Sequence, residues 1–156
     1  MYQKIIEYAE ALDKISRERR RDFHRYPETA WLEMRTSAVI AKVLTELGYE
    51  VLTGKDVCLE SSRLGVPSSE ELKEHAERAL LQGAPAEYLT EEMRAGFTGV
   101  IGILRCGEGP VTALRFDIDA LGLTEDENVN HRPFAEGFAS RNPGMMHGCG
   151  HDGHAA

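Results

Sequence analysis

The sequence predicts an α/β fold in which helices and strands form layers around one core, and three observations lead to this prediction. Apolar residues recur at helical spacing over residues 2–25 and 36–47. β-branched and apolar residues are dense over 98–118, as in strands. The predicted elements also alternate along the chain, which is typical of layered α/β domains. With 156 residues and 42% hydrophobic content, the chain is large enough for one domain with a packed core.

The first predicted helix covers residues 2–25. It ends before Pro27, because proline restricts the preceding Tyr26 to extended conformations. Its apolar residues share one face of the helix: Ile5, Ile6, Ala9, Leu12 and Ile15.

The second predicted helix covers residues 36–47 and precedes a short strand. Thr36 or Ser37 is expected to cap its N-terminus, and Gly48 to stop it at the C-terminus. The segment 49–53, "YEVLT", has the β-branched and aromatic residues of a strand.

Residues 55–97 differ from their surroundings and are predicted to be helix-rich. One helix is expected over 68–82, entered through a serine cap after Pro67. A second helix is expected within 84–97.

Two strands are predicted after this helical region, at 98–105 and 111–118. The Gly- and Pro-containing stretch "CGEGP" between them is typical of a turn. We therefore expect these strands to form an antiparallel pair or to be neighbours in one sheet.

Composition limits the classes of protein and partner. A net charge of −8 argues against a general nucleic-acid or anionic-membrane surface. No apolar run approaches the roughly 20 residues that span a bilayer. Three scattered cysteines do not suggest a disulfide framework, and the charged, amphipathic first residues do not resemble a signal peptide. A cytoplasmic protein that binds neither nucleic acid nor membrane is expected.

Two carboxylates stand where the second predicted strand ends. Asp117 and Asp119 are two residues apart, so in an extended segment both side chains point to the same side. Such a pair is costly to bury without a cation or hydrogen bonds. The alternative, an exposed strand end with turn-favouring aspartates, is about equally consistent with this segment alone.

The segment 144–156, "GMMHGCGHDGHAA", contains the densest group of metal-binding residue types. Cys149 and His151 flank Gly150, and glycine lets the backbone fold tightly enough for both side chains to reach one ion. Thiolate, imidazole and carboxylate together suit zinc, or manganese where oxygen ligands dominate. We favour a metal site over a Gly-rich loop with incidental histidines. Four of the six histidines lie near this end of the chain: His131, His147, His151 and His154.

Three segments carry a family resemblance: "RRDFHRYPETAWLEMRTS", "ALRFDIDALGL" and "MMHGCGHDGHAA". In this order and at these distances they resemble the N-terminal part of the metal-dependent amidohydrolase and aminoacylase peptidase family. The segment 56–84 and the stretches "GFTGV" and "HRPFAEGFAS" resemble one branch more closely, the A subunits of p-aminobenzoyl-glutamate hydrolases. The resemblance implies the N-terminal part of a layered zinc-peptidase-like catalytic domain over 1–156. It also implies a helical insertion at about 55–97 and a lid or dimerisation domain outside these residues.

The resemblance also implies roles for individual residues. Cys149 and His151 match ligands of a two-metal site, and Asp119 matches the acidic residue that supports the site during catalysis. Asp117 falls where related peptidases have a histidine ligand, and we include it as a candidate ligand. Two of the remaining matches, His24 and Glu28, are interpreted as structural. The other three are interpreted as supporting the metal ligands or packing the metal loop: His147, Asp152 and His154.

The implied reaction is hydrolysis of an amide bond in an N-acyl amino acid, p-aminobenzoyl-glutamate first of all. The metals, zinc or manganese, activate water and polarise the carbonyl, while a downstream glutamate acts as base. That base and further ligands are expected outside 1–156, so the chain alone is expected to be inactive. A homo-oligomer, or a hetero-oligomer with a homologous B subunit, is expected for the longer protein. Two alternatives stay open: a general hippurate-type amidohydrolase, and a non-catalytic metal-binding or partner subunit.

Overall fold

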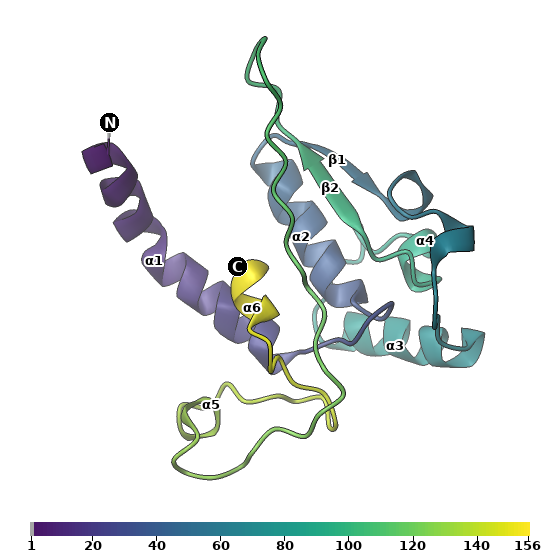
Figure 1. Ribbon diagram of the computed structural model, residues 1–156. Helices are drawn as coiled ribbons and strands as arrows, with labels where there is room; N and C mark the ends of the chain where they lie inside the picture. The colour runs from purple at the N-terminus through teal and green to yellow at the C-terminus, as the bar shows by residue number, and fades with distance from the viewer. Residues whose placement is uncertain (1) are drawn as a thin grey trace.

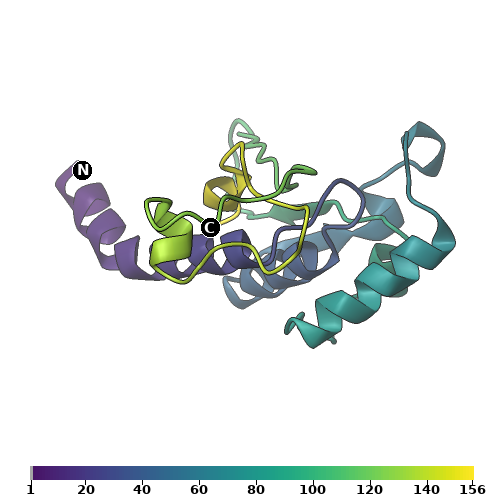
Figure 2. The same ribbon diagram turned by 90° about the horizontal axis from the view of Figure 1, so that it is seen from below.

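The computed structural model describes residues 2–156 and contains mixed helices with one small sheet (Figure 1). The longest helix, α1 (Tyr2–Arg25), extends to one side, and α3 (Ser69–Leu81) lies at the opposite side in both views (Figure 2). Among these residues, no helix is both long and apolar enough to span a membrane.

Helix α2 (Met34–Glu46) packs against both α3 and the sheet, and together these elements form the apolar body of the molecule. The sheet has two antiparallel strands, β1 (Glu50–Thr53) and β2 (Val100–Ile103), with Glu50 opposite Ile103. One turn of helix, α4 (Glu91–Arg94), contacts both α2 and α3. The buried core of this body comprises Leu32, Met34, Ala38, Ala41, Leu72, Ala76, Ala79, Ala84, Leu89 and Met93.

The start of α2 differs from the prediction. The helix begins at Met34, and neither Thr36 nor Ser37 caps it. Instead the buried Glu28 accepts hydrogen bonds from the backbone N–H groups of Arg35, at 3.0 Å, and Thr36, at 2.8 Å. A carboxylate from outside the helix thus satisfies N–H groups that a local cap would otherwise serve. The predicted stop is confirmed, since Gly48 follows the helix with φ +83°.

The helical character of residues 55–97 is confirmed, although less of the segment is helical than predicted. Ser68 caps α3 by accepting a hydrogen bond from Glu71 N at 3.2 Å, as the sequence predicts. Within 84–97 only α4 forms, capped by Thr90. Short 3₁₀ turns at Gly54–Asp56 and Glu60–Ser62 precede α3.

The predicted strand over 111–118 is wrong, and so is its pairing with the strand at 98–105. β2 pairs with β1, and residues 104–119 leave the sheet as an extended strand-free segment (Figure 1). Val111 and Leu114 are 95% and 77% exposed, respectively. A strand requires a partner for its N–H and C=O groups, and high β-propensity alone does not provide one.

Candidate metal centre

The last helical turn, α6 (His151–His154), lies beside the C-terminal half of α1 (Figure 1). Gly150 precedes it with φ +79°, a left-handed conformation that favours glycine. The segment before the turn is fixed by Leu121 and Met146, which exchange backbone hydrogen bonds of 2.9 and 3.0 Å. The loop that carries Asp119 and the turn that carries His151 are therefore neighbours.

Three candidate ligands meet at this turn. One ligand atom from each of Asp117, His151 and His154 lies within 4.8 Å of the others. Asp117 and His151 are half-buried, and the rings of His151 and His154 stack with centroids 5.2 Å apart. One carboxylate and two imidazoles form a donor set that suits zinc or manganese, so these residues fit a divalent metal.

Asp119 binds the ring of His151 through Nδ1. Nδ1 of His151 lies 3.0 Å from Oδ1 of Asp119 and 2.9 Å from its carbonyl oxygen. Because both oxygens are acceptors, Nδ1 carries the proton, which leaves Nε2 as the ring's available ligand atom. A histidine fixed by a carboxylate in this way is the usual arrangement at protein metal sites.

Cys149 lies outside this group. Its side chain is exposed, and it is not among the three residues whose ligand atoms converge. Gly150, between Cys149 and His151, has φ +79°, and His151 begins the helical turn α6. The role of Cys149 as a ligand stays a prediction.

His147 is buried near the same turn and is neutral. Only 4% of it is exposed, and neither ring nitrogen has a hydrogen-bond partner among residues 2–156. Burial lowers the pKa of His147 to about 4, because an imidazolium there would lose its hydration.

A second group of side chains, which we call the charged cluster, fastens α6 to α1. The buried His24 lies between two carboxylates: Nδ1 is 2.8 Å from Oδ2 of Asp152, and Nε2 is 2.8 Å from Oε1 of Glu125. Two further side chains complete the pairing. The charged cluster comprises Arg20, His24, Glu125, His131 and Asp152, with Arg20 on Asp152 at 2.8 Å and His131 on Glu125 at 2.7 Å.

The contacts of His24 and Glu28 are those of structural residues, as the sequence interpretation has them. The sequence gives no sign of the partners of His24, because Glu125 and Asp152 are 101 and 128 residues away along the chain. The sequence interpretation also leaves His154 out of the candidate ligands, although it stands three residues after His151 on the same helical turn, a spacing that brings side chains together.

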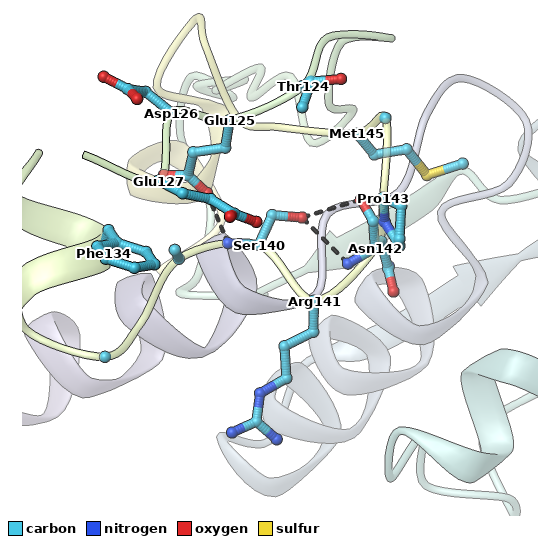
Figure 3. A pocket seen from close by; sticks show the side chains of 13 residues that line it. Thr124, Glu125, Asp126, Glu127, Phe134, Ser140, Arg141, Asn142, Pro143 and Met145 are labelled. Carbon is cyan, nitrogen blue, oxygen red and sulfur yellow. Dashed lines mark hydrogen bonds between the residues drawn. The ribbon is translucent and has the colours of Figure 1, made fainter.

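A cleft of about 430 Å³ has Glu125 of the charged cluster in its lining (Figure 3). None of the converging ligands lines it. Three of its polar residues, Glu125, Ser140 and Asn142, are linked by hydrogen bonds. Oε2 of Glu125 accepts from Ser140 N, and the Ser140 hydroxyl donates to the carbonyl of Asn142. The cleft is lined by residues 124–127, 134, 137 and 139–145.

Comparison with known proteins places this geometry in a family context. Residues 113–156, which contain all the candidate ligands, match Peptidase family M20/M25/M40. The chain is 50% identical over 138 residues to the p-aminobenzoyl-glutamate hydrolase A subunit of Escherichia coli, covering 88% of this chain and 31% of that protein. It is 49% identical to indole-3-acetyl-aspartic acid hydrolase of Enterobacter agglomerans, with the same coverage.

A solved structure of similar sequence also has a similar fold. The crystal structure of aminobenzoyl-glutamate utilization protein from Klebsiella pneumoniae matches with a TM-score of 0.72 and 40% identity, covering 76% of this chain and 30% of that one. The chain thus spans about 31% of the length of the curated relatives. The predicted resemblance is confirmed: residues 113–156 match Peptidase family M20/M25/M40, and 88% of the chain is similar to the p-aminobenzoyl-glutamate hydrolase of E. coli.

Proposed function

We propose that this chain contributes to the metal site of an amidohydrolase that cleaves N-acyl amino acids. The observation that carries the proposal is the convergence of Asp117, His151 and His154 within the segment that matches the peptidase family. A divalent metal, zinc or manganese, would supply the Lewis acidity that polarises the amide carbonyl. His151 and Asp117 would hold the metal, with Cys149 and His154 as further ligands, and Asp119 would orient His151.

The substrate class follows from two relatives of nearly equal identity. One is named for p-aminobenzoyl-glutamate and the other for indole-3-acetyl-aspartic acid. Both compounds join an aromatic acyl group to an acidic amino acid by an amide bond. We propose such conjugates as the substrates, p-aminobenzoyl-glutamate first.

The wider organisation is proposed on the same basis. Residues 1–156 would belong to a catalytic domain with two metals, in which 55–97 is a helical insertion. The lid would be formed by other residues. The protein would act in the cytoplasm as a homo-oligomer or with a homologous B subunit, since the E. coli relative is named as the A subunit of its hydrolase.

A chimera tests the activity. Residues 1–156 would replace the matching segment of the E. coli relative, and release of p-aminobenzoate would be followed with zinc or manganese. We expect turnover, and loss of turnover in His151→Ala. A folded, metal-loaded chimera that hydrolyses neither p-aminobenzoyl-glutamate nor indole-3-acetyl-aspartate would overturn the proposal.

Zinc titration of the chain itself tests the ligands. We expect Cys149→Ala and His151→Ala to weaken binding, because each removes a donor from the site. Cys106→Ala is the matched control, since Cys106 is equally an exposed free cysteine. Equal losses from both cysteine variants would remove Cys149 from the ligand set.

A further inference from the structure

His24 connects three parts of the chain that are far apart in sequence. It stands near the end of α1, while Glu125 lies in the loop after Asp119 and Asp152 lies on α6. Only 2% of His24 is exposed, so its contacts with these carboxylates are shielded from water.

The two hydrogen bonds determine the protonation state of the ring. Ionised carboxylates only accept hydrogen bonds, so each ring nitrogen of His24 must donate. Burial lowers the pKa of His24, but the hydrogen bonds and charges of Asp152 and Glu125 more than offset burial and raise the pKa above its ordinary value. Arg20, paired with Asp152, supplies the second cation facing these two anions.

The turn α6 presents two different sides. Asp152 faces α1, where both His24 and Arg20 bind Oδ2. His151 and His154, on either side of Asp152 in the sequence, reach Asp117 instead. The contact that fastens Asp152 therefore fixes the orientation of a turn only four residues long.

We propose that His24, held doubly protonated between Glu125 and Asp152, is a positioning residue for His151 and the metal site on α6. The presence of a metal rests on the proposed function. The orientation of His151 can be measured in the metal-free chain. His24 is not among the residues whose ligand atoms converge. It acts through Asp152 on the turn and through Glu125 on the loop that follows Asp119.

The first test needs no variant and no metal. The ¹⁵N shifts of the His24 ring, measured by NMR in the wild-type chain at neutral pH, should show two protonated nitrogens. A ring with one bare nitrogen would overturn the proposal.

The second test compares His24→Gln with His75→Gln in the metal-free chain. His75 is also buried, but it lies on α3 beside Arg78 in the apolar body. Glutamine at 24 cannot donate from both ends, so the amide signals of residues 119–120 and 151–153 and the ring signals of His151 should shift. His75→Gln should leave them in place. Unmoved His151 signals in a folded His24→Gln chain would overturn the proposal.

Zinc titration of the same variants gives the third readout. We expect His24→Gln to weaken zinc binding about tenfold or more, in the range typical of residues that orient ligands. His75→Gln should bind as the wild type does. An equal affinity in His24→Gln and wild type would overturn the positioning role. Absence of zinc binding by the wild type would instead count against the proposed function, and the His151 signals would still decide the role of His24.

Discussion

The apolar body and the charged cluster are held together by different forces. The body buries alanine, leucine and methionine side chains between α2, α3, α4 and the sheet, and its contacts are non-directional. The charged cluster joins α1, α6 and the loop at 125–131 through hydrogen-bonded ions. The first kind of packing tolerates volume-conserving changes, whereas the second fails when one partner loses its charge. The candidate ligands His151 and His154 lie on α6, which the charged cluster binds to α1.

The largest expected effect comes from removing a charge from the cluster. Asp152→Asn keeps the size of the side chain but removes an anion from the buried His24 and from the partly exposed Arg20. Breaking a buried pair in this way costs about 3 to 5 kcal/mol of the free energy of unfolding. Urea unfolding followed by circular dichroism measures it.

The control for this change is Glu136→Gln. Glu136 pairs with Arg21 and Arg132 at the surface, where ion pairs contribute little. Similar unfolding midpoints for both variants would show that the cluster does not depend on its charges.

The second effect belongs to the apolar body. Met93 is fully buried at the contact of α4 with its neighbours, and Met93→Ala would leave a cavity. We expect a loss of about 2 to 5 kcal/mol, against a negligible change for Leu81→Ala, because Leu81 is 89% exposed. The comparison would be contradicted if Met93→Ala shifted the His151 ring signals as much as His24→Gln does.

A smaller effect depends on pH. Burial raises the pKa of Glu33 to about 7 from an ordinary value of 4.5, while a hydrogen bond from Thr98 Oγ1 at 2.7 Å opposes the rise. Between these values the folded chain holds a proton that the unfolded chain has released. Glu33 therefore favours folding below pH 4.5, and this contribution is lost as the pH rises towards 7.

The measurement is the difference in unfolding free energy between Glu33→Gln and wild type across this range. As the pH rises from 4.5 to about 7, the variant should become more stable relative to wild type. The change should be on the order of 1 kcal/mol per pH unit. Parallel stability curves would mean that the pKa of Glu33 is the same in the folded and the unfolded chain.

Features that depend on local sequence are predicted well, and features that depend on contacts between distant residues are not. The helix over 2–25, the serine cap at 68 and the stop at Gly48 follow from spacing and local chemistry, and the structure confirms them. The strand over 111–118 is wrong, because its composition favours a strand while no neighbouring strand pairs with it. The cap of α2 and the partners of His24 depend on contacts between residues distant in the chain, which no local pattern encodes.

The smallest expected effect is local to α3 and tests whether the two regions are independent. Ser68 accepts a hydrogen bond from Glu71 N, so Ser68→Ala should cost about 1 kcal/mol of unfolding free energy. Ser68→Asp should restore it, because aspartate also caps and its charge favours the helix N-terminus. The cap belongs to the apolar body and touches no member of the charged cluster. Zinc affinity should therefore be equal in Ser68→Ala, Ser68→Asp and wild type. If Ser68→Ala weakened zinc binding as His24→Gln is expected to do, loss of stability anywhere in the chain would explain both results, and the separate role of the charged cluster would be refuted.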